Sequence, residues 1–160
     1  MIRPVCAEDA EEIAAIYNYY VRETTISFET EPLSEEVMRA RVEAFAAECP
    51  YLVWEEAGRV LGYAYAHPWK ERAAYSHTWE VTIYLHPEAR GRGIGRELMA
   101  QLIPACRQAG CEVLIACITH GNETSCAFHQ RLGFRQVSHF SGVGRKFGEL
   151  LDVVDYQLTL

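Results

Sequence analysis

One stretch decides how this chain folds, and it reads Ile83-Tyr84-Leu85-His86-Pro87-Glu88-Ala89-Arg90-Gly91-Arg92-Gly93-Ile94-Gly95-Arg96-Glu97-Leu98. The residues before His86 are typical of a strand, and the apolar pattern after Gly93 is typical of a helix. Between them, the seven positions from Arg90 to Arg96 hold three glycines and three arginines. Glycine lets a backbone approach a ligand closely, and a helix N-terminus offers unpaired N–H groups to an anion. The stretch therefore predicts a loop that binds a phosphate-bearing ligand.

Two common phosphate-binding motifs do not fit this loop. A dinucleotide fingerprint requires G-x-G-x-x-G, whereas the glycines here stand at positions 91, 93 and 95. A P-loop ends in Gly-Lys followed by Ser or Thr, whereas Arg96 replaces the lysine and no hydroxyl residue follows it. An ordinary Gly-rich turn before a helix remains an alternative when the loop is considered alone.

The bulk composition predicts a single domain over residues 1–160. Hydrophobic residues make up 49% of the chain and charged residues 23%, which is ordinary for a globular protein. The formal net charge of −7 argues against non-specific binding of nucleic acid and favours a small polar substrate. The sequence shows no apolar export signal or membrane-spanning run, so we expect a cytoplasmic protein with no membrane partner. The six cysteines form no C-x-x-C pair, and we expect them to be reduced and packed.

Hydrophobic periodicity predicts an α/β chain with the element order ααβββαβαββ. The expected helices cover residues 8–22 and 34–48, a stretch that begins near Gly93 and has apolar positions up to Cys106, and residues 122–132, with Pro104 weakening or kinking the third. The expected strands cover residues 51–55, 60–67, 76–85, 113–118, 134–140 and 151–158, with a Gly-rich hairpin at 141–149. Strand 76–85 alternates, so Trp79 and Val81 share one face while Glu80 and Thr82 share the other. Residues 23–33 have no period and are expected to form a loop.

The glycine loop also fits the pattern Arg/Gln-x-x-Gly-x-Gly/Ala, and a later segment reads Asn122-Glu-Thr-Ser-Cys-Ala-Phe-His-Gln-Arg-Leu-Gly-Phe134. Together these segments resemble the GCN5-related N-acetyltransferases. The resemblance implies a central mixed, mostly antiparallel sheet of about six to seven strands, flanked by about four helices. It also implies acetyl-CoA as co-substrate, with its pyrophosphate across the glycine loop, and a homodimer.

Other segments narrow the resemblance to the phosphinothricin and methionine-sulfoximine acetyltransferases. They are Ile16-Tyr17-Asn18, Phe28-Glu29-Thr30-Glu31-Pro32, Pro68–Tyr75, Thr78-Trp79-Glu80 and the region of Lys146-Phe147-Gly148 and Asp152. The resemblance therefore covers essentially the whole chain.

Two residues are candidates for the catalytic groups. Glu80 lies mid-strand, where partial burial would raise its pKa towards a value useful for a general base, and the resemblance points to the same position. The alternative is a solvated carboxylate on an exposed strand face. His129 falls where many relatives carry a tyrosine that protonates the leaving thiolate, and a histidine can donate a proton near neutral pH. The alternative is a histidine packed on its helix.

Other residues are candidates for ligand binding. The resemblance implies that the cofactor contacts Ile83, Tyr84, Leu85, Arg90, Gly91, Arg92, Gly93, Ile94, Gly95, Arg96 and Asn122. Asn122 could instead be a plain N-cap, and Arg92 and Arg96 could be solvated. For the substrate we expect Arg72 to bind a carboxylate, with Ala73 and Ala74 beside it and with Phe28 and Tyr75 as walls. Arg72 could instead be a surface charge. We expect no metal, because no carboxylate or cysteine stands at a ligand spacing from the histidines.

The sequence thus predicts an N-acetyltransferase that moves the acetyl group of acetyl-CoA to the α-amine of a small amino-acid-like substrate. Phosphinothricin, methionine sulfone and methionine sulfoximine are the expected acceptor types, with direct attack and Glu80 as the base. The alternatives are a protein or polyamine N-acetyltransferase and an acyl-CoA-binding sensor without turnover.

Overall fold

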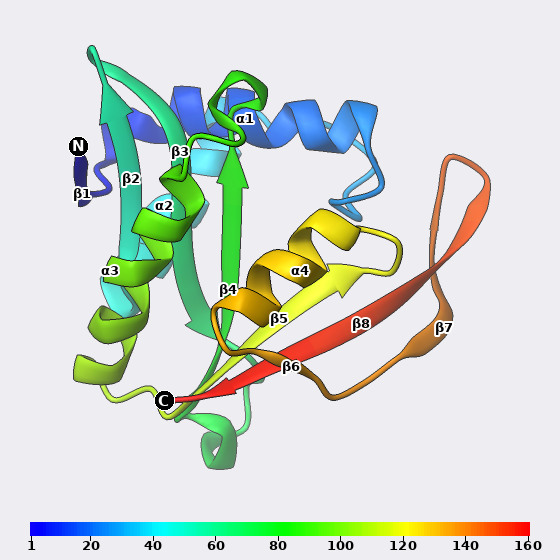
Figure 1. The fold of residues 1–160 in the computed structure, drawn as a ribbon. Helices are drawn as coiled ribbons and strands as arrows, with labels where there is room; N and C mark the ends of the chain where they lie inside the picture. Colours follow the sequence, from blue (N-terminus) through cyan, green and yellow to red (C-terminus); the bar gives the residue numbers. More distant parts are fainter.

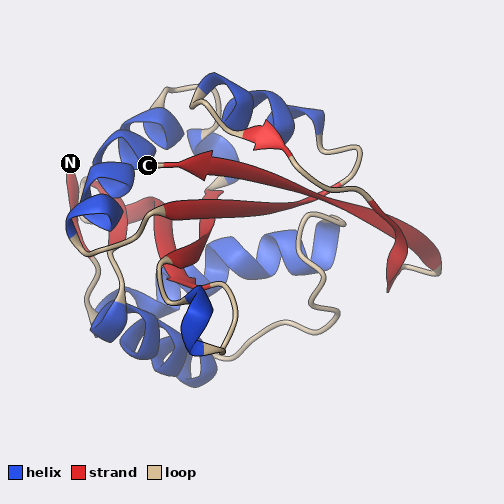
Figure 2. Cartoon of the chain, turned by 90° about the horizontal axis from the view of Figure 1, so that it is seen from below, coloured by secondary structure: helices blue, strands red, loops and turns tan.

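The computed structural model describes residues 1–160, which form one twisted sheet with helices on both of its faces (Figures 1 and 2). The helices are α1 (Ala10–Glu23), α2 (Glu35–Glu48), α3 (Ile94–Gln108) and α4 (Glu123–Arg131), with 3₁₀ turns at Ala7–Asp9, Ala73–Tyr75 and Pro87–Ala89. The strands are β1 (Ile2–Pro4), β2 (Tyr51–Glu56), β3 (Arg59–Pro68), β4 (Thr78–Leu85), β5 (Val113–Thr119), β6 (Arg135–Gln136), β7 (Phe140–Lys146) and β8 (Glu149–Thr159).

The sheet has the strand order β1-β2-β3-β4-β5-β8-β6, and β7 pairs with β8. Only β4 and β5 are parallel, and their register covers three pairs, from Thr78 opposite Val113 to Glu80 opposite Ile115. Beyond Glu80 the two strands separate (Figure 1). The expected mixed, mostly antiparallel sheet with four helices is confirmed, and the separation of β4 from β5 opens its centre.

The strand count is eight rather than six or seven, for two reasons. β1 is only three residues long and ends at Pro4, so it leaves no periodic signal. The residues expected to form one strand at 134–140 contain β6 and the start of β7. Most of the hairpin expected at 141–149 belongs to β7, and the turn between β7 and β8 lies at Phe147 and Gly148. The Asp152 carboxylate stabilises an irregularity in β7 by accepting hydrogen bonds from the Gly142 N–H and the His139 ring, each at 2.7 Å.

Two apolar layers cover the two faces of the sheet. α1 and α2 bury Ile13, Ile16 and Val42 against β2 and β3, and the Ser34 hydroxyl caps α2 by accepting from the Val37 N–H at 3.2 Å. On the opposite face α3 buries Leu98 and Leu102 against β2, β3 and β4. α3 continues through Pro104 to Gln108.

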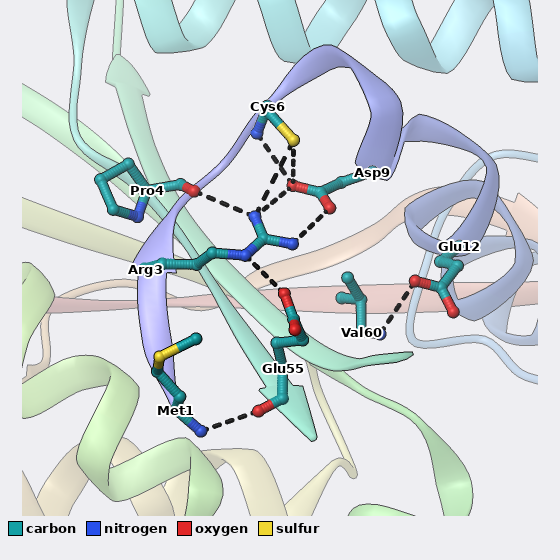
Figure 3. Close-up of polar contacts among 8 residues, drawn as sticks. All are labelled: Met1, Arg3, Pro4, Cys6, Asp9, Glu12, Glu55 and Val60. Atoms are coloured by element: carbon teal, nitrogen blue, oxygen red, sulfur yellow. Dashed lines mark hydrogen bonds and ion pairs between the residues drawn. The ribbon is translucent and has the colours of Figure 1, made fainter. Parts of the chain in front are cut away.

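The N-terminal strand is held by a cluster of ion pairs (Figure 3). The Arg3 guanidinium donates to both Asp9 carboxylate oxygens at 2.8 Å, and its Nε donates to the Glu55 carboxylate at 2.6 Å. Burial acts to raise the pKa of Asp9, but hydrogen bonds from Arg3 and Cys6 outweigh it and hold that pKa below its usual value. The cluster therefore ties β1 to β2 and to the start of α1.

Candidate active site

A cavity of about 290 Å³ lies where β4 and β5 separate. Its walls come from Glu80–Tyr84 of β4, from Ala116–Thr119 of β5, and from the loop residues Ile26–Phe28. α4 and its N-cap contribute three further side chains, those of Asn122, Ser125 and His129. The divergence of the only parallel strand pair thus creates the site.

Glu80 stands on this cavity at the last pair of the β4–β5 register. Its neighbours Trp79 and Val81 are buried in the layer under α3, so the predicted alternation of faces is confirmed. Burial raises the pKa of the Glu80 carboxyl, although the positive charge that His67 can carry acts in the opposite direction. The Nε2 atom of His67 lies 3.9 Å from a Glu80 oxygen. The raised pKa makes this carboxylate a stronger base than an exposed glutamate.

His129 also lines the cavity, and its side chain is only 3% exposed. Its Nδ1 lies 2.9 Å from the Ser125 carbonyl oxygen, which can only accept, so Nδ1 carries the proton. Burial lowers the pKa of His129, so the neutral ring with a lone pair on Nε2 is favoured. That Nε2 is buried without a hydrogen-bond partner. The neutral ring would accept a hydrogen bond at Nε2, and donation from Nε2 would require prior protonation.

The glycine loop lies between the end of β4 and α3. Gly91 and Gly93 have φ values of +73° and +82°, which favour glycine, and Gly93 is the N-cap of α3. The first hydrogen bond of the helix runs from the Glu97 N–H to the Gly93 carbonyl at 3.2 Å. The preceding N–H groups, from Ile94 to Arg96, are therefore available to an anion.

The arginines of this loop differ in their surroundings. The Arg90 guanidinium lies 5.2 Å from the ring centre of Tyr20, and Arg92 pairs with the Glu56 carboxylate at 2.6 Å. Arg96 is exposed near the helix start. The loop itself does not line the cavity, but Gly95 is adjacent to Ile83 and to Phe128 of α4, so loop and cavity are neighbours.

Asn122 is an N-cap, one of the two roles that the sequence left open. Its Oδ1 caps α4 by accepting from the Ser125 N–H at 3.2 Å. It also lines the cavity, where its amide nitrogen can still donate to a ligand.

The residues expected to bind the substrate are not all brought together. Phe28 lines the cavity, as do Ile83 and Tyr84 from the expected cofactor set. Arg72, Ala73, Ala74 and Tyr75 form or flank the 3₁₀ turn before β4 and do not line it. No Lys or Arg side chain lines the cavity.

Two functional neighbours of Glu80 were not predicted as such from the sequence. His67 faces Glu80 directly across β3 and β4, a relation that depends on strand register. Cys117 lies on β5 beside the cavity, and burial together with the nearby Glu80 and Asp155 carboxylates raises the pKa of its thiol to about 12. Alternation within β3 and β5 does not reveal these neighbours, because it gives the shared face only when the register with β4 is known.

A metal centre requires several ligand side chains close together, and a membrane span requires a long apolar helix. No group of three or more His, Cys, Asp or Glu side chains is arranged to hold a metal ion. No helix has the length and apolar character needed to cross a membrane.

Comparison with known proteins agrees with this geometry. Residues 13–134 match the acetyltransferase (GNAT) family. The chain is 39% identical to the phosphinothricin N-acetyltransferase of Streptomyces coelicolor, over 99% of this chain and 95% of the relative. It is 37% identical to the L-methionine sulfoximine/L-methionine sulfone acetyltransferase of Pseudomonas paraeruginosa, over 99% and 94%.

A solved structure gives the same result. The phosphinothricin acetyltransferase of Sinorhizobium meliloti, in complex with acetyl-CoA, superposes with a TM-score of 0.95 at 36% identity, covering 100% of this chain and 88% of that one. The resemblance seen in the glycine loop and the Asn122–Phe134 segment is thereby confirmed. The chain belongs to the GNAT acetyltransferase family.

Proposed function

We propose that this protein transfers the acetyl group of acetyl-CoA to the α-amine of a small amino-acid-like acceptor, of the phosphinothricin or methionine sulfone/sulfoximine type. The acceptor class is supported by the activities of the relatives. One observation carries the proposal: Glu80, a carboxyl whose pKa burial raises, lies in a cavity of small-molecule size where β4 and β5 separate.

In the proposed reaction Glu80 removes a proton from the acceptor's ammonium, directly or through a water molecule. The free amine then attacks the thioester carbonyl carbon, the C–N bond forms, and the C–S bond breaks. Backbone N–H groups near the end of β4 would stabilise the negative charge that develops on the carbonyl oxygen. His129 remains the candidate for delivering a proton to the departing sulfur, and its lowered pKa means that it must first gain that proton.

The transfer is proposed to be direct, without an acyl-enzyme. Cys117 is the cavity's only cysteine, and its pKa of about 12 keeps it a thiol at neutral pH. A thiol is a much weaker nucleophile than a thiolate. Glu80 therefore activates the acceptor amine rather than an enzyme nucleophile.

We propose that acetyl-CoA binds along the end of β4 and the start of α3. The available N–H groups of residues 94–96 would hold the pyrophosphate, and Arg96 can add a charge. Arg90 and Arg92 would contribute only by leaving Tyr20 and Glu56, respectively. Ile83, Tyr84, Leu85 and Asn122 would contact the remaining arm.

The acceptor's carboxylate needs a cation, and Arg72 stays our prediction for it. Because Arg72 lies outside the cavity, this role requires the turn before β4 to approach the site. The absence of Lys and Arg from the cavity, together with Glu80, favours a second candidate function, the acetylation of a polyamine or of a lysine side chain.

We also propose a homodimer. Large apolar side chains are exposed along the C-terminal strands, among them Val143, Phe147 and Leu150, each at least 60% exposed. Such a patch is typical of a protein–protein contact. A cytoplasmic location stays a prediction.

A thiol-release assay with acetyl-CoA tests the proposed function. The acceptor panel is phosphinothricin, methionine sulfone, methionine sulfoximine, proteinogenic amino acids, spermidine and a lysine peptide. We expect turnover with the first three. Turnover confined to spermidine or the peptide would support the second candidate, and calorimetric binding of acetyl-CoA without any turnover would support a sensor.

The same assay tests Glu80. We expect Glu80→Gln to lower kcat by about a hundredfold or more, the usual contribution of a general base. Glu112→Gln is the matched control, because Glu112 is an exposed carboxylate just before β5. A Glu80→Gln enzyme with wild-type kcat at every pH would exclude Glu80 as the base.

A further inference from the structure

The hairpin of β7 and β8 contacts the loop that walls the cavity. This loop, residues 24–33, carries Ser27 and Phe28, both of which line the cavity. The Lys146 ammonium at the end of β7 donates to the Ser27 carbonyl oxygen at 2.6 Å. Two residues earlier, Gly144 lies directly against the ring of Phe28. The hairpin projects from the body of the molecule (Figure 1), and Val153 of β8 also lines the cavity.

We propose that Gly144 and Lys146 are positioning residues that set the width of the acceptor cavity by fixing where Phe28 lies. This inference rests on the proposed function, because it assigns to β7 the control of acceptor size in that same site.

Space rather than backbone conformation requires glycine at position 144. A Cβ placed there would lie 2.8 Å from Cζ and 2.9 Å from Cδ2 of Phe28, and closer still to Cε2. Gly144 is not among the residues with positive φ, so its backbone accepts any L-residue. A side chain at 144 would therefore displace the ring, and the ring lies between β7 and the cavity.

Lys146 fixes the backbone beside that ring. The side chain is only 3% exposed, and its one hydrogen bond goes to Ser27. A buried ammonium is retained only where its partner is well placed, and here the nearby Glu29 carboxylate adds favourable charge. Glu29 in turn accepts two hydrogen bonds from Arg41 of α2, at 2.6 and 2.9 Å, and one from Tyr17 of α1.

The loop is thus fixed by the helices, by β5 and by β7. Thr119 of β5 donates to the Thr25 carbonyl oxygen at 2.8 Å, and the Ser27 hydroxyl donates to Tyr17 of α1 at 2.9 Å. The contacts of Glu29 with α1 and α2 hold the outer part of the loop. The contacts of β7 hold Ser27 and Phe28, the part that lines the cavity. A change at 144 or 146 should therefore alter acceptor selection without altering acetyl-CoA binding.

The kinetic test compares Gly144→Ala with Ser141→Ala. Ser141 is exposed on the same strand, three residues from Gly144, so its change alters β7 away from the contact with Phe28. We expect Gly144→Ala to lower kcat/KM for methionine sulfone relative to alanine by roughly tenfold, the usual effect of one misplaced carbon in a substrate pocket. The KM for acetyl-CoA should stay unchanged, and Ser141→Ala should behave as wild type. An unchanged acceptor ratio in Gly144→Ala would overturn the proposal.

A double-mutant cycle of unfolding free energies tests the contact without any turnover. In the wild-type background Gly144→Ala should destabilise the fold, and in a Phe28→Ala background it should not. Additive effects would overturn the inference even if the acceptor were different from the one proposed. Lys146→Met, which keeps the length of the side chain, should raise KM for the acceptor and leave KM for acetyl-CoA unchanged.

A failure of the proposed function gives a different pattern. The wild-type protein would then release no thiol with any acceptor, while the unfolding cycle would still report the coupling between residues 28 and 144.

Discussion

Three influences of opposite sign set the pKa of the Glu80 carboxyl. Burial is the largest and raises the pKa of the Glu80 carboxyl. His67 on β3 lowers that pKa, and the Asp155 carboxylate on β8 raises it. Because the pKa of Glu80 is raised, its ionised form, which accepts the proton, is populated only at higher pH. On the acidic side of the pH profile, kcat/KM should therefore rise with pH.

Replacement of His67 should move that limb. In His67→Gln the positive charge that favours ionised Glu80 is lost, so the midpoint of the acid limb of kcat/KM should shift to higher pH. His77→Gln is the control, since His77 is exposed and comes just before β4. Identical pH profiles for wild type and His67→Gln would show that His67 does not act on Glu80.

The face on which a residue lies could be predicted from the sequence where the apolar pattern of a single strand determines it. The alternation of apolar and polar residues along β4 was sufficient to place Glu80 on the face opposite Trp79. The partners of Arg92 and Arg90 could not be predicted in the same way. Glu56 and Tyr20 are distant in sequence, and only the folded chain brings them to the glycine loop.

Among the elements, α3 shows how one residue serves both conformation and binding. Gly93 caps the helix in the left-handed region, and Gly110 after its other end has a φ of +98°. Either Gly→Ala change should cost about 1 kcal/mol of unfolding free energy, because a Cβ disfavours this conformation. Only Gly93→Ala should also raise KM for acetyl-CoA. Equal KM values in the two variants would argue against this loop as the pyrophosphate site.

The β1 element depends on Arg3. Removing the guanidinium in Arg3→Met leaves the nearly buried Asp9 carboxylate without its ion pair, so the unfolding free energy should fall by about 2–3 kcal/mol. Arg39→Met, which breaks an exposed pair with Glu35, should cost far less, because solvent screens an exposed ion pair. Chemical denaturation measures the unfolding free energy of both variants. Equal losses in Arg3→Met and Arg39→Met would contradict the conclusion that the Arg3 cluster stabilises the fold more than an exposed ion pair does.

The same cluster gives the stability a dependence on pH. The pKa of Asp9 is lower in the folded chain, so its contribution is present above the unfolded pKa and is lost as pH falls through the folded value. Arg3→Met should therefore show a smaller loss of stability on acidification than the wild type.

Elements were predictable in proportion to their length. α1, α2 and α3 each span at least 14 residues. Apolar periods predicted α1 and α3, and the Ser34 cap together with Pro50 predicted the bounds of α2. β1 and β6 have three and two residues, and they exist because longer strands pair with them. The path of β7 depends on the Asp152 side chain ten residues from Gly142, which no local pattern reveals.

At the scale of the whole molecule, the exposed apolar side chains of the C-terminal hairpin predict self-association. Phe147→Asp should convert a dimer to a monomer in light scattering coupled to size-exclusion chromatography, because a charge cannot be buried there without a partner. Val37→Asp is the control, since Val37 is 46% exposed on α2. A wild-type protein that is already monomeric would refute the homodimer.

The divergence of β4 from β5 has a consequence for the stability of the molecule as a whole. It leaves an edge inside the sheet, where the second half of β4 has lost its parallel neighbour. Hydrogen-bonding groups at such an edge are completed by water in the free protein and can be completed by a ligand. Amide hydrogen exchange in β4 should therefore slow when acetyl-CoA is added. The melting temperature of the protein should rise with the concentration of acetyl-CoA, because a ligand that binds only the folded chain stabilises it. The concentration of acetyl-CoA around the protein would then also set the stability of its fold.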